Sequence, residues 1–292
     1  MATLSKGEEM HPQGNGTRSA HGERRAWVRR LLFLALATAT ASQAFRSGTA
    51  LAGCCEEGTK ELLAEHIEEY TATGNTDLPG CADTTESLVE EFEDAGGWSR
   101  TWFADFDAWE SDWKKTSLPG GDDASWSDAR DFAYFCGHGN VGRVTFTTNN
   151  TDQRLLNTDT GFGDVDVEWV VFDTSLTLQR QAGAAELDTW YSNAFAGGLH
   201  LLIGWHDSPS DGDTGGEFAD EMIDMSWLDG GGQTIKNAWF DSDGGCTDQD
   251  DGTTQMIVAE DLAHYDDFLH GEGGHAADGA FDGNYWMWSH DC

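Results

Sequence analysis

The sequence predicts an α/β fold, a three-layer α/β/α sandwich built around a mostly parallel sheet. Three short apolar runs, at 132–136, 167–172 and 199–205, carry this prediction because none alternates polar with apolar residues as a half-buried strand does. Segments with helical spacing lie between and after these runs, as in chains whose strands are joined by crossover helices. Each run ends in glycine or polar residues, and sites in such sheets form at the carboxyl ends of the strands.

The remaining elements follow from apolar spacing and breaks at glycine and proline. Helices are expected over 56–70, 85–94, 98–113, 187–195, 217–227 and 234–240, with a further strand at 255–259. Thr85 is placed to cap the second helix, and His66 is expected as an ordinary residue of the first. Five aromatic residues recur at helical steps, which favours a helix face buried on the sheet over a sugar-binding platform; they are Trp98, Trp102, Phe106, Trp109 and Trp113.

The charge balance is strongly acidic. Seven of the 16 basic and three of the 53 acidic residues lie in 1–53, so nine and 50 remain in 54–292, a net charge of −41. Such a field repels nucleic acid and anionic lipid, and the compact state needs counterions to screen its self-repulsion. The acidic residues are spread over periodic, aromatic-rich sequence, which resembles proteins of extreme halophiles and argues against disorder. We therefore expect folding to depend on molar salt.

Residues 1–53 are predicted to be an export leader, which leaves 54–292 as a single domain. Arg24 and Arg25 precede the apolar run 31–45, an arrangement similar to a twin-arginine signal. The run is too short and too rich in alanine and threonine for a good membrane span. Cys54 ends a stretch that looks like a lipobox, so lipidation there would be the protein's membrane contact; ordinary cleavage near 39–41 is the alternative.

Export places the cysteines in an oxidising compartment, where they can pair. If Cys54 carries lipid, five remain and one of them is free. We expect a disulfide at Cys292, with Cys246 the first candidate partner. Cys136 either approaches the site described next or is a buried or disulfide-bonded residue.

Polar residues stand where the three apolar runs end. His138 follows the first run between two glycines, and Ser175 follows Asp173 and Thr174 at the end of the second. A period of two places Asp173 and Ser175 on one face of a strand. His206 and Asp207 end the third run, whereas His200 within it is expected to be a hydrogen-bonded core residue.

The order of these features resembles the caspase, gingipain and CHAT group of cysteine peptidases, and within it an uncharacterised family of caspase-like domains. The similarity covers about 125–242 and consists of a strand ending in His-Gly, the strand VVFDTSLTL, the segment GLHLLIGWHD…GGEFADEMI and the helix IKNAWFDS. It implies that His138 is the catalytic histidine and that Gly139 helps to form the oxyanion hole. The nucleophile of the group falls on Ser175, where this chain has a hydroxyl in place of a thiol.

Serine needs a base within hydrogen-bond reach and usually a third group that orients that base, a role open to Asp173 unless it is a solvated strand-end acid. The implied substrate is a peptide or protein, in a cleft lined by Cys136, Asn140, Thr174, His206 and Asp207. Together with the predicted leader, the resemblance implies an exported hydrolase that is a peptidase or a related acyl-transfer enzyme. The alternative is an inactive cell-surface binding module that kept the fold but lost the thiol.

No cofactor is expected. Two acidic clusters could bind a divalent cation, but neither has a recognisable ligand spacing. One holds His264, His270 and His275 among Asp266, Asp267 and Glu272, and the other holds Asp207, Asp211, Asp213 and Glu217.

Overall fold

The computed structural model describes residues 58–71, 73–147, 152–180, 190, 192–195, 197–209, 212–223, 231–242, 253–278 and 284–291. The leader, Cys54, Cys246 and Cys292 lie outside these residues, so export, lipidation and the expected carboxyl-terminal disulfide stay predictions. Within them, no helix has the length and apolar character needed to cross a membrane.

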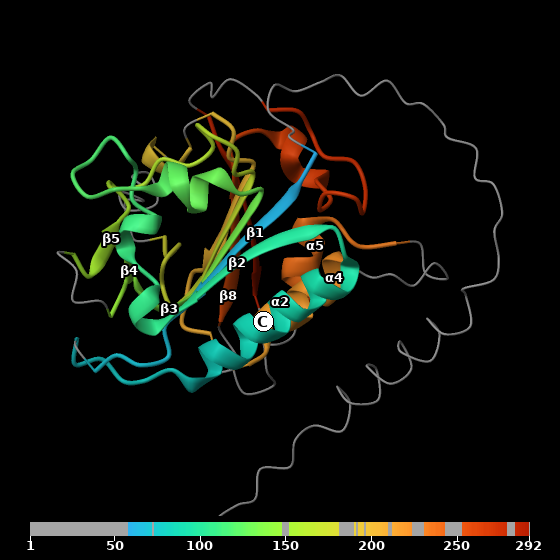
Figure 1. Ribbon diagram of the computed structural model, residues 1–292. Helices are drawn as coiled ribbons and strands as arrows, with labels where there is room; N and C mark the ends of the chain where they lie inside the picture. The colour runs from blue at the N-terminus through green and yellow to red at the C-terminus, as the bar shows by residue number, and fades with distance from the viewer. Residues whose placement is uncertain are drawn as a thin grey trace, which may run out of the picture. The chain divides into compact units, whose positions relative to one another are not determined.

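A mixed, mostly parallel sheet of nine strands forms the centre of the described residues (Figure 1). Its main path runs β2-β1-β3-β6-β7-β8-β9, and the short strands β4 and β5 extend from β3. The pairs from β2 to β7 are parallel, whereas β8 runs antiparallel to β7 and β9 antiparallel to β8. The strands are Lys60–His66 (β1), Trp98–Ala104 (β2), Phe132–Asn140 (β3), Arg143–Thr145 (β4), Arg154–Leu156 (β5), Trp169–Thr174 (β6), Leu201–Trp205 (β7), Thr254–Ala259 (β8) and Trp286–Asp291 (β9). The predicted α/β class is therefore confirmed.

Three α-helices pack together on one face of this sheet: α2 (Pro79–Ala95), α4 (Thr214–Met222) and α5 (Ile235–Asp241). The other face is covered by the β4–β5 hairpin, by helical residues at 190 and 192–194, and by irregular chain. That irregular chain contains short 3₁₀ helices, including Asp105–Asp107 (η1), Glu110–Asp112 (η2), Asp123–Ser125 (η3) and Ser127–Ala129 (η4), while Leu262–Asp266 (η6) follows β8. Both faces of the central strands are thus removed from water.

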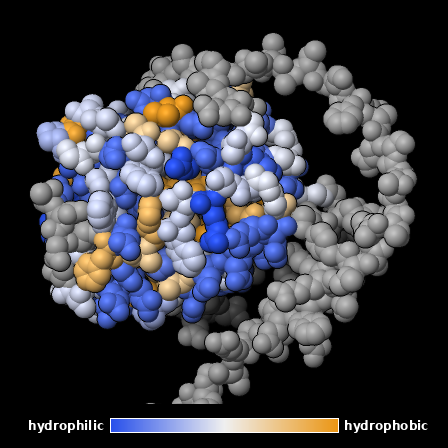
Figure 2. All heavy atoms as spheres, viewed as in Figure 1, coloured by the Kyte–Doolittle hydropathy of each residue, from blue (hydrophilic) through white to orange (hydrophobic). Residues whose placement is uncertain are grey.

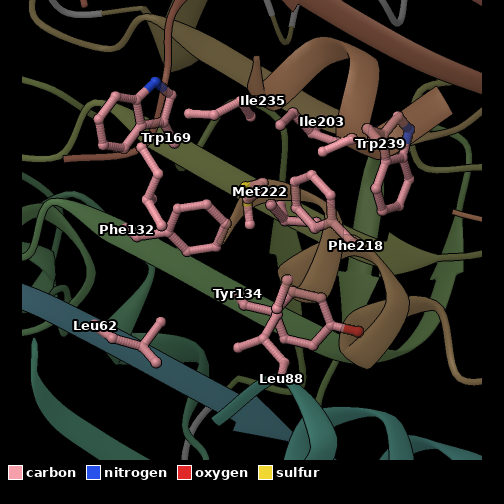
Figure 3. Packing of buried hydrophobic residues seen from close by; sticks show 14 of the residues in the cluster. Leu62, Leu88, Phe132, Tyr134, Trp169, Ile203, Phe218, Met222, Ile235 and Trp239 are labelled. Carbon is pink, nitrogen blue, oxygen red and sulfur yellow. The ribbon is translucent and has the colours of Figure 1, made fainter. Parts of the chain in front are cut away.

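The core on the helical side is rich in aromatic residues (Figure 3). Phe218 packs edge-on against Trp239 at a ring-centroid distance of 5.2 Å, and it also contacts Phe132 of β3 at 6.2 Å. Full burial of one such side chain contributes about 1.5–3 kcal/mol. These contacts join α4 and α5 to the middle of the sheet.

The segment expected to be the first helix is instead the buried strand β1. The carboxylate of Glu65 in β1 is fully buried and accepts a hydrogen bond of 2.8 Å from Trp113 Nε1. The tertiary structure overrides the local helix propensity here. Pairing with β2 on one side and β3 on the other satisfies the backbone hydrogen-bonding groups, and it buries Leu62 and Leu63 on opposite faces of the sheet.

The expected aromatic helix over 98–113 is also wrong: this stretch forms the edge strand β2 and then 3₁₀ turns. Trp113 is fully buried, but Trp102, Phe106 and Trp109 are 38%, 46% and 42% exposed, so the five rings share no buried helix face. Trp102 Nε1 donates to His66 Nδ1 at 3.2 Å, which ties β2 to β1. Elsewhere, hydrophilic side chains cover most of the face seen in Figure 2, as an acidic domain requires.

The later elements agree more closely with the predictions. Helix α2 covers the expected 85–94 but begins at Pro79, so Thr85 lies inside the helix and does not cap it. Helix α4 begins before the expected 217, and α5 and β8 match 234–240 and 255–259 within one residue at each end. Thr234 caps α5 by accepting the N–H of Asn237. Strands β4, β5 and β9 were not predicted.

Candidate active site

A small pocket of about 60 Å³ lies at the carboxyl ends of β3 and β6. These strands and β7 are parallel neighbours, so their carboxyl ends share one edge of the sheet. Four of the predicted site residues line the pocket: Cys136, Asp173, Thr174 and Ser175. The rest of the lining is Leu78, Gly80, Cys81, Thr84, Gly137, Pro209, Gly212 and Thr214, which come largely from the start of α2 and the loop before α4.

His138 lies in β3, and Ser175 directly follows β6, the strand paired with it. Each directly follows a member of the last β3–β6 pair, Gly137 and Thr174, and neighbouring strands lie about 4.8 Å apart. Gly139 is packed against the same segment, because a Cβ at this position would lie 2.4 Å from the carbonyl oxygen of Ser175. The close approach of the two strand ends therefore requires glycine at 139. No histidine of the described residues is among those that line the pocket.

The imidazole of His138 is held by the turn that precedes α2. Its Nε2 lies 2.8 Å from the carbonyl oxygen of Thr76, and its ring packs on Tyr70 at a centroid distance of 4.5 Å. A carbonyl can only accept, so Nε2 carries a hydrogen, and in the neutral tautomer with this hydrogen the lone pair is on Nδ1. Thr76 thus fixes the tautomer, which is the role that a third group has in a catalytic triad.

Tyr70 also ties the end of β3 to β4. Its hydroxyl accepts the backbone N–H of His138 at 2.7 Å and donates to the carbonyl of Thr145 at 3.1 Å. Burial raises the pKa of Tyr70, and the hydrogen bond from His138 lowers it in part, so the hydroxyl stays protonated and keeps both bonds.

Asp173 does not have the orienting role that the sequence suggested. Its two carboxylate oxygens accept hydrogen bonds from the Tyr134 hydroxyl at 2.6 Å and from Trp205 Nε1 at 2.7 Å. It is not a solvated strand-end acid either, since it is 7% exposed. Burial raises the pKa of its carboxyl group and the two donors lower it in part. Asp173 connects β3, β6 and β7 beneath the pocket.

Cys136 forms a disulfide with Cys81 of α2, with the two Cα atoms 5.4 Å apart. This confirms the disulfide-bonded alternative and excludes Cys136 as a free thiol near the site. The bond fastens the first turn of α2 to the middle of β3, so the pocket wall that both cysteines line is covalently fixed.

The chain turns sharply after Ser175. Leu176 has a φ of +61°, a left-handed conformation that is uncommon for a residue with a branched side chain. Its N–H donates to the carbonyl of Asp207 at 3.0 Å, so Asp207 supports the turn through its backbone. Thr174 Oγ1 contacts Thr177 Oγ1 across the same turn. Conformations of this kind are retained where surrounding contacts enforce them, often at functional sites.

Two predicted cleft residues lie elsewhere. The side chain of Asn140 accepts the N–H of Val141 at 2.8 Å in the β3–β4 turn. His206 Nδ1 lies 2.9 Å from Asp207 Oδ2, and His206 lines a separate groove of about 480 Å³ at the ends of β7, β8 and β9. These two side chains are not part of the pocket around Ser175.

A family model described as a domain of unknown function, DUF6345, matches residues 64–290. The chain belongs to the DUF6345 family. The match covers most of the described residues and includes His138, Ser175 and the pocket. No curated protein matches the chain. The family description names no activity, so inferences about function rest on the geometry of the site.

A second polar cluster lies at the opposite edge of the sheet. Asp131, Glu168 and His200 directly precede β3, β6 and β7, and the segment after β8 adds His264 and further polar residues. Of these residues, those after β8, where His264 and His270 lie near Asp267, were considered from the sequence for a cation site, whereas His200 was expected to be a core residue. The other acidic cluster considered for a cation lies in the loop before α4 and includes Asp213. This residue has a structural role, because it caps α4 by accepting the N–H of Gly216 at 3.2 Å. Asp211 of that loop lies outside the described residues.

Proposed function

We propose that this domain is an exported serine-type hydrolase with a caspase-like arrangement, and that its substrates are peptides or proteins. The observation that carries the proposal is the hydrogen bond between His138 Nε2 and the carbonyl of Thr76, since it leaves Nδ1 as the candidate base on β3, the strand paired with β6, after which Ser175 lies. An acidic domain of this kind is a poor partner for nucleic acid, and we propose that it contacts the membrane only through a lipid on Cys54.

The proposed reaction is acyl transfer in two steps. Ser175 Oγ attacks the substrate carbonyl carbon, His138 Nδ1 takes the hydroxyl proton, and the Gly139 N–H stabilises the oxyanion. The carbon–nitrogen bond then breaks, and His138 gives the proton to the leaving amine. Water attacks the resulting ester with the same histidine as base, which releases the acid and restores the serine.

Two features of the pocket support this proposal. Leu176 has a left-handed backbone conformation, which is unfavourable for a leucine, so the surrounding contacts must stabilise the turn that holds Ser175. The Cys81–Cys136 disulfide makes the adjacent wall rigid, and a fixed wall reduces the reorganisation needed during a reaction. Serine needs tighter base geometry than cysteine, which makes such rigidity more valuable here.

The second candidate is a binding module without catalysis. It is favoured by the small volume of the pocket, about 60 Å³, and by the position of His138 outside its lining. In that case Ser175 and its neighbours contact a ligand group, and the histidine stabilises the turn before α2.

An active-site serine probe of the fluorophosphonate type, applied in molar salt, separates the two candidates. The enzyme proposal expects Ser175 to be labelled, with labelling lost in Ser175→Ala and His138→Ala and kept in Ser99→Ala, a change at an exposed serine of β2. Circular dichroism shows whether each variant is folded.

A Ser175→Cys variant tests the scaffold itself. If only this variant reacts, with a thiol probe, the native protein is a silenced relative and catalysis by Ser175 is refuted. If no variant reacts with either probe, the binding-module candidate is the one that stands.

A further inference from the structure

A cluster of histidine and carboxylate side chains lies at the amino ends of the parallel strands, which we call the amino edge of the sheet, and the proposed hydrolase does not use it. His200 precedes β7 and is fully buried, and the η6 segment after β8 brings His264 and Asp267 over it, each 1% exposed. Because β6 is six residues long and a strand rises about 3.3 Å per residue, this edge lies roughly 20 Å from the Ser175 pocket. The two sites can therefore be tested independently.

The imidazole of His200 lies between two carboxylates. Its Nδ1 is 2.8 Å from Asp267 Oδ2, and its Nε2 is 3.1 Å from Asp278 Oδ1. The ring of His264 stacks on it at a centroid distance of 3.7 Å, and His264 Nδ1 is 3.4 Å from the same oxygen of Asp267. One carboxylate oxygen thus faces a nitrogen from each of two buried imidazoles.

His264 is the unexplained member of this cluster. Both of its ring nitrogens are buried without a hydrogen-bond partner among the described residues, since the nearest carboxylate oxygens are Asp267 Oδ2, 3.4 Å from Nδ1, and Glu260 Oε1, 3.9 Å from Nε2. A buried polar group without a partner costs about 1–3 kcal/mol. Two stacked imidazoles also make a poor apolar core, because each ring must bury two nitrogens. A core residue of similar volume would avoid this cost, so the arrangement points to a ligand.

We propose that His200, His264 and Asp267 bind a divalent transition metal ion of the zinc class. Two imidazole nitrogens and one carboxylate oxygen are a ligand set that zinc accepts, with a fourth position open to water. Donors around a tetrahedral ion with bonds of about 2.0–2.1 Å lie about 3.3 Å apart, and the two distances to Asp267 Oδ2 are 2.8 and 3.4 Å. Because the two rings are stacked at an interplanar angle of 27°, binding requires them to separate and rotate until one nitrogen of each points at the ion.

The surroundings of these residues suit such a site. Asp278 holds the second nitrogen of His200, as carboxylates do for many metal-binding histidines. The N–H of Ala276 donates to Asp267 Oδ1 at 2.7 Å, which leaves Oδ2 facing the imidazoles. The ligand carboxylate and one ligand imidazole are therefore already oriented.

A neighbouring trio supplies the control. His270 Nε2 lies 3.4 Å from Asp131 Oδ1 and 3.4 Å from Glu168 Oε1, so a single imidazole stands between two carboxylates. Asp131 Oδ2 also accepts the N–H of Glu61. His270 Nε2 is, like the ring nitrogens of His264, buried without a hydrogen-bond partner among the described residues. This compact set of donor atoms, however, contains one imidazole and two carboxylates, which is a poorer ligand set for zinc than two imidazoles and one carboxylate.

The test is calorimetric titration of Zn²⁺ into the full chain, stripped with a chelator and kept in molar KCl to screen weak binding to the acidic surface. We expect one tight equivalent in the wild type, affinity at least about tenfold weaker in His264→Gln, and little change in His270→Gln. X-ray absorption of the zinc-loaded wild type should count two imidazoles, and this result does not depend on whether a variant folds.

Three results would overturn the assignment. They are no saturable zinc binding, equal binding by the wild type and a folded His264→Gln variant, or loss of binding in His270→Gln with His264→Gln unaffected. An absorption spectrum with oxygen ligands alone would likewise place the ion on surface carboxylates.

Discussion

Asp128 offers a pH-dependent test of the packing beside β3. It lies in η4 and is fully buried, and its Oδ1 accepts the N–H of Gly163 at 2.5 Å. Its Oδ2 is buried with no hydrogen-bond partner among the described residues. Burial, and after it the neighbouring Asp164, raises the pKa of Asp128 to about 9. The folded protein therefore holds a proton that the unfolded chain releases.

The sign of the effect follows from proton linkage. The carboxyl pKa is about 3.9 in the unfolded chain and about 9 in the folded one, so the folded state loses stability as the pH rises between these values. Each pH unit corresponds to about 1.4 kcal/mol, which gives a cost of about 4 kcal/mol at pH 7. Asparagine is a neutral isostere that can still accept the N–H of Gly163. We expect Asp128→Asn to remove most of this cost.

The assay is urea unfolding followed by tryptophan fluorescence in molar KCl. The free energy of unfolding of Asp128→Asn should exceed that of the wild type, and the gap should widen by about 1.4 kcal/mol per unit from pH 5 to pH 8. Asp107→Asn makes the same charge change at an exposed position and should show no such slope. A gap that stays constant with pH, or a less stable variant at pH 8, would refute the reasoning.

Three further predictions concern the pocket wall, the disulfide and the surface. Gly139→Ala should lower the free energy of unfolding by about 1–3 kcal/mol, because the new methyl group meets the Ser175 carbonyl; a denaturation midpoint equal to that of the wild type would contradict this. Replacing Cys81 and Cys136 by alanine together should cost about 4 kcal/mol, given a sequence separation of 55, and thermal unfolding unaffected by reductant in the wild type would show that the bond contributes little. Dilution from about 3 M to about 0.1 M salt should unfold the domain through unscreened repulsion, and an unchanged circular dichroism spectrum would count against it.

Strands β3, β6 and β7, of which the first two line the pocket, were predictable because each is buried on both faces. Such strands appear in a sequence as continuous apolar runs, and their ends are marked where glycine or polar residues begin. This is why Thr174 and Ser175 were located correctly at the end of β6. Strand β1 was missed because its flanking glutamates and leucines also fit a helical period, and only pairing with β2 and β3 decides between the two.

The contacts that define the two sites join residues far apart in the chain. Thr76 is 62 residues from His138, and Asp267 is 67 residues from His200. No local pattern specifies such a pair, since the length and path of the intervening chain determine which turn meets which strand end. Asp173 shows the same limit: its position on the strand was predicted, but its partners Tyr134 and Trp205 come from two other strands.

By itself, the sequence determined the acidic character of the domain, its α/β class and the strand ends where polar side chains gather. Burial and charge can be inferred from the sequence because the type of each residue must suit its own exposure to solvent. The tertiary structure alone decided which nitrogen of His138 is available, which cysteines pair, and that His200 and His264 meet at the amino edge. These features depend on the distance and direction between side chains brought together by parallel strands and their crossovers, and a linear pattern does not contain that information.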